Sequence, residues 1–456
     1  MRGPGDHNMI VAMLVTGAMV TVALLVAISA PAANLTPATH LGVASCAGTT
    51  CHGRSLPDGK IVRQDEILRW QEPSSAGGAH SRAFAVLRSA RGEQIAHRLG
   101  LGDAASAPSC IGCHADNAAS RGPTFQINDG VGCEACHGGA RGWIESHRVV
   151  GATHAGNVVH GMTALENPLV RANNCLDCHY GSAKAGQFVT HKIMAAGHPR
   201  ISFELDLFSA LQAHHNEDAD YIARKGRPSS MRFWAVGQAM AIERSLSLFM
   251  SPQHGTEGAF PEFTFFDCHS CHRRIQDNLS FNPTAVDNPA RPIPPGTPPY
   301  NDENMIMLSA AAKVAAPELG RRFDTDARAF HAAIARDRPS ALAAAARLRG
   351  GTDALARAFA ATDFSRKQMF DILDTISGEA ISPRFTDYTG SAQSVMAVDT
   401  LLNALVKDGA VSPEIAASAR PAINQAYAAV RDPNDYRPAA FRAALGSAVQ
   451  SIRGLR

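Results

Sequence analysis

The sequence predicts a mainly α-helical chain with little regular sheet, divided into two parts of different character. Over the C-terminal third, cysteine is absent and alanine-rich runs such as Ala341–Leu348 favour helices. The preceding part holds all ten cysteines and is broken by glycine-rich segments, which favour loops between short helices. The length of 456 residues allows two or three domains. We therefore expect an irregular cysteine-bearing module followed by a helical bundle.

An unbroken apolar run from Met9 to Ile28 comes first, and Ala30-Pro31-Ala32 follows it as a small-residue cleavage pattern. The run is also just long enough to cross a bilayer. Residues 1–33 therefore fit either a cleaved signal peptide or a retained membrane anchor. Under both interpretations the rest of the chain is exported. No Lys or Arg occurs between Arg2 and Arg54, so the positive charge stays on the inner side of the membrane. We expect the body of the protein on the periplasmic side of the cytoplasmic membrane.

The ten cysteines form five pairs, and a histidine follows the second cysteine of every pair. Four pairs have the spacing CxxCH, and the first has four residues between its cysteines. The motifs are Cys46/Cys51/His52, Cys110/Cys113/His114, Cys133/Cys136/His137, Cys175/Cys178/His179 and Cys268/Cys271/His272. CxxCH attaches c-type haem: the thiols bind the vinyl groups, and the histidine is the proximal iron ligand. Disulfides or zinc knuckles do not require that histidine, so we predict five covalently bound c-type haems.

Histidine is concentrated in the same part of the chain. Seventeen of the nineteen histidines lie between His40 and His272, and the motifs use only five of them. A second imidazole on the other face of a haem gives six-coordinate iron, which suits electron transfer. The candidates for this distal position are His80, His147, His191, His198, His214 and His254. His214 and His215 point in different directions on a helix, so at most one of them binds a given iron. His331 lies in an alanine-rich helical pattern and is expected in solvent.

All five motifs fall within residues 34–281, which we interpret as one multihaem cytochrome c domain. The haems must then be close neighbours and form much of its core. Helices are expected at Glu66–Gln71, Arg82–Leu99, Ile201–His214 and Met231–Met250. The glycine-rich stretches 130–142 and 151–161 are expected to be loops.

Residues 282–300 are rich in proline and predict an extended connector. Residues 301–456 predict an alanine-rich domain of six to eight short helices. Ser412 and Pro413 are typical of an N-cap and a first helical position, and Pro438 is expected to begin the last helix. Gly350-Gly351 is interpreted as the end of a helix. This domain shows no catalytic constellation, so a structural or docking role is expected for it.

Several segments between Cys46 and His179 resemble the cytochrome c-554 family, whose tetrahaem members accept electrons from hydroxylamine oxidoreductase. Trp70 is followed by His80, and Cys110–His114 leads after a short interval into the string Asp129–Gly138. The segment Trp143–His147 follows, beginning with a tryptophan and ending with a histidine. The wider first motif, the fifth motif and the long C-terminal region depart from the family pattern.

The resemblance implies axial ligands for several haems. By the family pattern His147 serves the haem of His179, and His80 serves a neighbouring haem, that of His137. A histidine after the fourth motif, namely His191, His198 or His214, then serves the first haem. The family also has one five-coordinate haem at the second motif, which here is the haem of His114.

We expect an electron carrier whose partners are a redox protein donor and a redox protein acceptor. The alternative is a multihaem oxidoreductase with one open haem iron that acts on a small nitrogen or sulfur compound. Tyr180, Lys192 and Arg200 could supply its proton donors and cations. A formal net charge of +2, from 43 basic and 41 acidic residues, gives no electrostatic footprint for nucleic acid.

Overall fold

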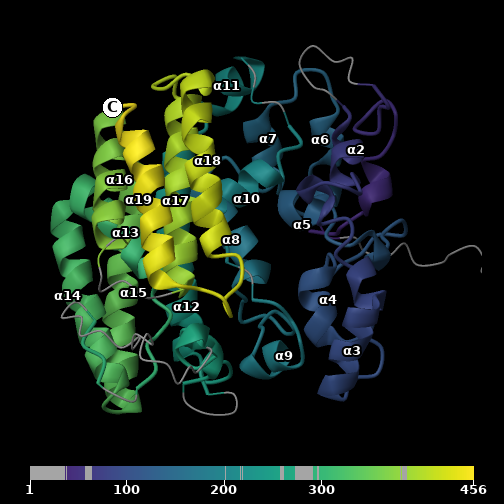
Figure 1. Cartoon of the computed structure of the whole chain (residues 1–456). Helices are drawn as coiled ribbons and strands as arrows, with labels where there is room; N and C mark the ends of the chain where they lie inside the picture. Colours follow the sequence, from purple (N-terminus) through teal and green to yellow (C-terminus); the bar gives the residue numbers. More distant parts are fainter. Residues whose placement is uncertain are drawn as a thin grey trace, which may run out of the picture.

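The computed structural model describes residues 36, 38–56, 64–200, 202–215, 217, 219–256, 261–272, 291–294, 297–380, 382 and 388–456. Within these residues the chain forms eighteen α-helices, joined by loops and short 3-10 turns (Figure 1). The extended pairing found there consists of isolated bridges, between His40 and Arg121 and between Phe266 and Tyr300. The predicted fold class, mainly α with little regular sheet, is confirmed.

The first part of the chain is built from short helices separated by loops. Side-chain caps begin several of them: Ser89 caps α3, Thr153 caps α7 and Thr190 caps α9 by accepting a backbone N–H. The helices of this part are α2 (Glu66–Trp70), α3 (Ala90–Leu99), α4 (Pro108–His114), α5 (Cys133–His137), α6 (Ile144–His147), α7 (His154–Val159), α8 (Pro168–His179), α9 (His191–Ala195), α10 (Leu205–Leu211) and α11 (Ala219–Lys225). Since so little apolar side chain is available in this part, bound cofactors are well placed to supply core volume.

The helix α12 (Ser230–Met250) lies between the two parts of the molecule. Ser229 caps it, and most of its side chains are buried, including Trp234, Val236 and Leu246. It packs against α8 and α10 on one side and against helices of the C-terminal region on the other. Burial of each such large apolar side chain contributes about 1.5–3 kcal/mol. The helix therefore fastens the two parts together.

Seven helices follow in the described C-terminal region, within the predicted six to eight. They are α13 (Glu303–Ala315), α14 (Pro317–Ile334), α15 (Arg338–Ala360), α16 (Arg366–Ala380), α17 (Tyr388–Lys407), α18 (Pro413–Ala429) and α19 (Pro438–Arg453). Ser412 caps α18, and Pro413 and Pro438 are first helical residues, as predicted. A continuous buried apolar cluster runs from α12 through these helices, so the region shares its core with α12.

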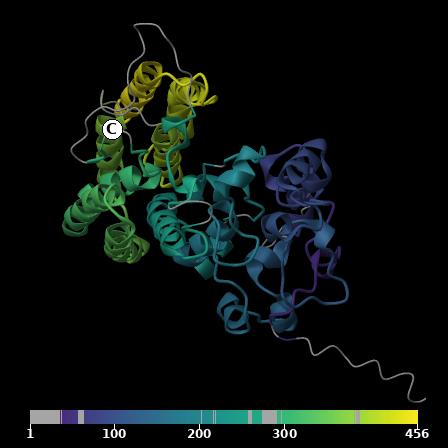
Figure 2. The ribbon, with the colours of Figure 1, turned by 90° about the horizontal axis from the view of Figure 1, so that it is seen from below.

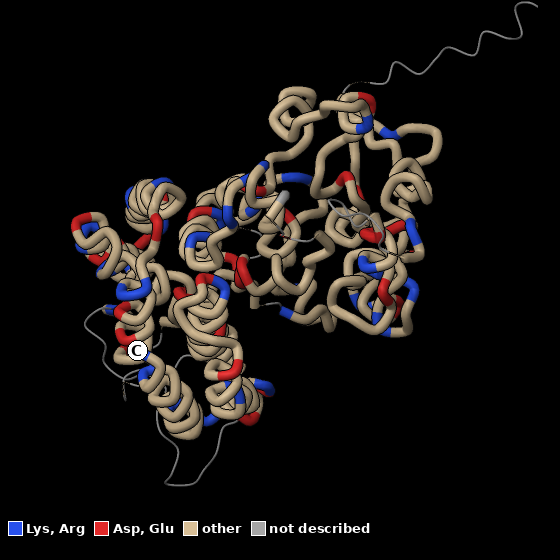
Figure 3. Tube along the Cα trace, turned by 90° about the horizontal axis from the view of Figure 1, so that it is seen from above, with Lys and Arg blue, Asp and Glu red and all other residues tan. Residues whose placement is uncertain are grey.

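The two parts form two lobes joined along α12 (Figure 2). Polar contacts reinforce the junction. Gln393 on α17 donates to the carbonyl of Phe203 at 3.0 Å, and Thr400 on the same helix donates to Glu204 at 3.0 Å. Acidic and basic residues are interspersed over both lobes (Figure 3).

Several local expectations were wrong. Gly350-Gly351 does not end a helix, because α15 continues to Ala360 between strong helix formers that pack on α12 and α14. The stretches 130–142 and 151–161 are not loops throughout. The first contains α5, and the second contains α7, which its Thr153 cap begins. The predicted helix Arg82–Leu99 is divided at Ser89 into a 3-10 turn and α3, and Ile201–His214 contains only the shorter α10. His331 is buried at 4% exposure, with Nε2 3.4 Å from Asp302.

Two expected segments lie outside the described residues. These are residues 1–33, interpreted as a signal peptide or anchor, and most of the connector 282–300. No helix in the described ranges is both long and apolar enough to cross a membrane.

Candidate haem-binding sites

Three of the five motifs present their cysteines and histidine in a common local geometry. They end the helices α4, α5 and α8, where residues i, i+3 and i+4 share one face. Both thiols and the imidazole of such a motif therefore point to the same side. In the wider first motif, the His52 N–H donates to the Cys46 carbonyl at 3.1 Å and the Cys51 N–H to the Gly48 carbonyl at 2.8 Å. The extra residues are thus taken up by a turn.

Each motif histidine faces a second histidine from a distant part of the chain. The separations of the ring centroids are 6.0 Å for His52 and His147, 6.2 Å for His179 and His80, 6.2 Å for His114 and His198, 6.2 Å for His137 and His214, and 6.0 Å for His272 and His191. Five of the six distal candidates are therefore brought opposite a motif histidine.

The spacing of these pairs fits a metal ion between the rings. Because an imidazole nitrogen binds a metal at about 2 Å, two rings on opposite sides of one metal have centroids about 6 Å apart. Rings in direct contact are closer: the centroids of His214 and His215 are 4.2 Å apart. No disulfide joins any of the ten cysteines, all of which the structure describes, so each motif also keeps the groups needed for thioether attachment. The residues present fit five c-type haems, each held by two thiols and two imidazoles.

Hydrogen bonds orient several of these rings. Nδ1 of His114 lies 2.9 Å from the Ala83 carbonyl, Nδ1 of His198 lies 2.8 Å from that of Pro199, and Nδ1 of His214 lies 2.7 Å from that of Gln212. A carbonyl only accepts, so Nδ1 carries the proton in each ring and Nε2 keeps its lone pair. This arrangement is typical of metal-binding histidine.

Burial keeps other rings in the neutral form that binds metals. Desolvation lowers the pKa of His179 to about 4, with a smaller contribution from His80, and lowers that of His214 to about 4, with His215 adding to the effect. Burial likewise lowers the pKa of His137 and of His80. Neutral imidazole is the ligand form, so these rings can bind a metal at neutral pH without first losing a proton.

His52 has a different partner from the other motif histidines. Its Nδ1 lies 2.9 Å from Oε2 of Glu66, a carboxylate only 7% exposed in its side chain. This hydrogen bond raises the pKa of His52. Burial opposes ionisation of Glu66, but its contacts with His215 and His52 outweigh that effect and lower its pKa. Sequence reasoning missed Glu66, because nothing in the local pattern links it to a motif histidine.

Two adjacent histidines approach the motif histidine His137. His214 is the better placed of the two, since its side chain is partly buried and its Nδ1 bonds the Gln212 carbonyl. His215 also lies 5.9 Å from His137, but its side chain is 43% exposed and its Nδ1 is 3.7 Å from Glu66. The geometry thus favours His214 as the ring opposite His137, with His215 beside it.

The pairing differs from the one that the resemblance implies. His147 faces His52 rather than His179, and His80 faces His179 rather than His137. The buried carboxylate of Glu134 explains the first difference: it accepts the N–H groups of Leu41 and Gly42 at 2.8 and 2.6 Å and that of Ala140 at 2.6 Å. These bonds hold the start of the first motif beside the segment that leads into α6.

The second motif also differs from the family pattern, because His114 faces His198. The sixth candidate, His254, is buried against Phe188 with centroids 4.6 Å apart. Its ring is therefore placed against this phenylalanine. Further histidines outside the motifs bind carboxylates: His40 lies 2.8 Å from Asp116 and His154 lies 2.9 Å from Glu166.

Contacts between the thiols show how the sites follow one another in space. The side chain of Cys46 lies next to that of Cys133, and the side chain of Cys113 lies next to that of Cys178. Cys136 is close enough to Cys175 and Cys178 for their charges to interact. The first site thus adjoins the third, the third adjoins the fourth, and the fourth adjoins the second.

Arg200 connects the fifth site to this series. Its guanidinium donates to the Cys268 sulfur at 3.1 Å, and Arg200 lines one cavity with Cys178 and His198. Cys51 of the first site and Cys271 of the fifth are exposed, whereas the other eight cysteines are half-buried. The first site therefore lies at one end of the series, and the fifth site, like the first, has a cysteine at the surface.

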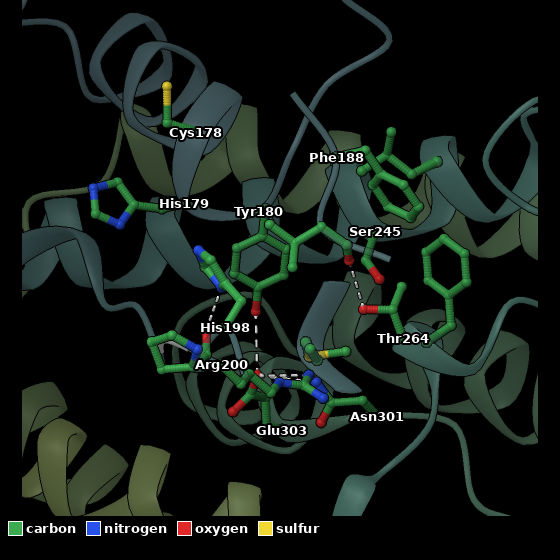
Figure 4. A pocket seen from close by; sticks show the side chains of 15 residues that line it. Cys178, His179, Tyr180, Phe188, His198, Arg200, Ser245, Thr264, Asn301 and Glu303 are labelled. Atoms are coloured by element: carbon green, nitrogen blue, oxygen red, sulfur yellow. Dashed lines mark hydrogen bonds and ion pairs between the residues drawn. The ribbon is translucent and has the colours of Figure 1, made fainter. Parts of the chain in front are cut away.

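That cavity, of about 100 Å³, contains the polar residues expected for an enzyme (Figure 4). The Tyr180 hydroxyl donates to Asn304 and lies 3.4 Å from Glu303, which is 3.8 Å from Arg200. Burial, and secondly the charge of Glu303, raises the pKa of Tyr180 well above its usual value. The arginine charge is balanced by Glu303, and the two cavity histidines, His179 and His198, each face another imidazole.

Comparison with known families identifies one part of the chain. Residues 45–138, which include the first three motifs, match the family described as cytochrome c554 and c-prime. This region is a cytochrome c554-type domain, which implies c-type haem cofactors and haem-based electron transfer. No curated protein and no solved structure matches the chain.

Proposed function

We propose that this protein transfers electrons through five c-type haems, each held by two cysteines and two histidines. The observation that carries the proposal is the set of five facing histidine pairs with centroids 6.0–6.2 Å apart. The match to the cytochrome c554 and c-prime family supports the first three sites, and the pairs His179/His80 and His272/His191 extend the same geometry beyond it.

The side chains assign a role to each part of a site. When bound, haem supplies a reversible one-electron couple. The two thiols of each motif would attach it covalently, and the two facing imidazoles would bind its iron. With both imidazoles bound, the iron would have no place for a substrate, which favours electron transfer over catalysis. The carbonyl partners of His114, His198 and His214 hold those rings in place whichever redox state is present.

The order of the sites defines a path. It runs from the first site through the third and fourth to the second and fifth, with the exposed Cys51 and Cys271 at its ends. Since electron exchange between proteins needs close approach, a redox protein donor and a redox protein acceptor would meet the chain at these two ends. We place the protein on the periplasmic side of the membrane, with residues 1–33 as its export signal or anchor.

The alternative, an oxidoreductase acting on a small nitrogen or sulfur compound, draws on the cavity beside Tyr180 and Arg200. It requires one iron with an open position. Low-temperature EPR of the oxidised protein, a carbon monoxide difference spectrum of the reduced protein and a haem count on the same sample separate the two functions. We expect five haems per chain, only low-spin signals and no carbon monoxide shift. One high-spin haem with a matching shift would contradict the proposal and favour the enzyme.

A further inference from the structure

The buried carboxylate of Glu66 contacts His52, the motif histidine of the first site. Its Oε2 accepts a hydrogen bond from the Nδ1–H group of His52 at 2.9 Å, and its Oε1 lies 3.7 Å from Nδ1 of His215. The backbone holds it there: the Ile67 N–H donates to the His52 carbonyl at 3.1 Å, and the Trp70 indole donates to the Val131 carbonyl at 3.1 Å. The helix α2 is thus fixed to both the first and the third motif, and Glu66 cannot turn away easily.

Other ligand rings have neutral acceptors at the same atom. Nδ1 of His114, His198 and His214 bonds a backbone carbonyl. Nδ1 of His179 is buried and has no hydrogen-bond partner among the described residues. Of the five motif histidines, all of which the structure describes, His52 is the one that bonds a carboxylate.

A carboxylate acceptor changes the donor strength of the imidazole. It draws the Nδ1 proton toward itself, so the ring becomes more anionic and Nε2 becomes a stronger electron donor to a metal. The negative charge of Glu66 also lies in a poorly hydrated position, where its field is weakly screened. Both effects stabilise the ferric form over the ferrous form, and hence lower the reduction potential.

We propose that Glu66 makes the His52 site the lowest-potential site of the five, and so the end of the series at which electrons enter. The inference rests on the proposed electron-transfer function. The location agrees with it, because this site is at one end of the series and its Cys51 is exposed. Electrons then run downhill from the first site toward the fifth. Glu66 acts through His52 and is a positioning residue.

The test is a potentiometric titration of the full-length protein and of Glu66→Gln, followed optically and by EPR. Glutamine keeps the shape and an acceptor oxygen but removes the charge. Of the five redox components, we expect the one with the lowest reduction potential to change. Its equilibrium constant for reduction should rise about tenfold, which raises the potential by about 59 mV for a one-electron couple. The other four should stay within experimental error. The low-spin EPR signal of the same haem should change with it.

The matched control is Glu166→Gln. Oε2 of Glu166 lies 2.9 Å from Nε2 of His154, which is also a contact between a carboxylate and an imidazole, but His154 faces no motif histidine among the described residues. It should shift no potential. If Glu66→Gln leaves all five components unchanged while five low-spin haems remain, the inference is wrong and the proposed function stands. If the wild-type protein itself lacks those haems, the proposed function fails instead.

Glu66→Gln could also reduce attachment at the first site. In that case the Glu66→Asp variant tests the inference, because aspartate keeps the negative charge but holds it farther from His52. With five haems bound, a smaller rise of the same lowest component supports the inference. An unchanged lowest component in this variant overturns it.

Discussion

At the scale of single residues, the contact made by Nδ1 determines what an imidazole can do at Nε2. In the rings of His114, His198 and His214 a carbonyl accepts the Nδ1 proton, and Nε2 is left to face its partner ring. The Asn157 amide nitrogen lies 3.3 Å from Nδ1 of His147, and the amide oxygen accepts a hydrogen bond from the Ser146 hydroxyl at 2.9 Å. Ser146 thus holds the amide beside this ring.

The pairing of His147 with His52 leads to a testable outcome. His147→Ala removes the second imidazole of the first site and leaves its thiols and His52 in place. We expect one haem in five to become high-spin and to bind carbon monoxide, as measured by EPR and by a difference spectrum.

His97→Ala is the control, because His97 is exposed near the end of α3 and faces no motif histidine in the described part of the chain. It should change neither spectrum. If His147→Ala also leaves every iron low-spin, His147 is not an axial ligand, and the 6.0 Å pair with His52 must be explained otherwise.

At the scale of elements, the helices of the C-terminal region show how packing overrides local signals. Gly350 and Gly351 resemble a helix end in the sequence, yet α15 continues through both to Ala360. The surrounding alanines favour helix, and Leu348 and Leu355 on either side are fully buried. The glycines weaken the helix locally without ending it.

Gly350→Ala and Gly351→Ala should each stabilise the protein by about 0.5–1 kcal/mol, because alanine loses less backbone entropy when it becomes helical. A Cβ atom at either position meets no heavy atom within 4 Å. The measurement is thermal or urea unfolding of the variants against the wild type.

Gly320→Ala is the matched comparison within α14. There a Cβ would lie 3.1 Å from the backbone of Ala312, so α13 and α14 would have to separate and stability should fall. Equal stabilisation by all three substitutions would mean that the contact between α13 and α14 is looser than the structure shows.

At the scale of the whole molecule, the sequence predicts the haem-attachment motifs but not which histidines pair across each site. The motif histidines could be read from the sequence, because two cysteines and a histidine within a few residues suffice. The partner of each ring could not. The two histidines of a pair are 77 residues apart for His137 and His214 and 99 apart for His80 and His179. Such pairs are set by how loops fold around the sites, which no local spacing encodes.

The junction of the two lobes was likewise not visible in the sequence. Its polar centre is Glu204, which caps α10 by accepting the N–H groups of Asp206 and Leu207 at 2.8 and 2.7 Å. Thr400 of α17 bonds the same carboxyl. The preceding residue, Phe203, stacks on His179 with centroids 4.8 Å apart. The junction therefore connects the C-terminal helices to the fourth site.

Glu204 gives this junction a pH dependence. Burial, and secondly the charge of Asp206, raises the pKa of Glu204 to about 8, from an ordinary value of 4.5. Between these values the folded protein holds a proton that the unfolded chain has lost. The contribution of Glu204 to stability is therefore fully present below about pH 4.5, and it is lost as the pH rises to about 8. At about 1.4 kcal/mol per pKa unit, the expected loss is up to about 5 kcal/mol.

Glu204→Gln tests this directly, because the amide cannot ionise. Urea unfolding at intervals between pH 5 and pH 9 should show the variant gaining stability relative to the wild type as the pH rises. Glu318→Gln, at a position 84% exposed, should show no such gain. A constant difference between Glu204→Gln and the wild type across this range would mean that Glu204 is already ionised in the folded protein. The two backbone N–H groups and Thr400 would then stabilise the charge more than burial opposes it, and the junction would be held by an anion rather than by a neutral acid.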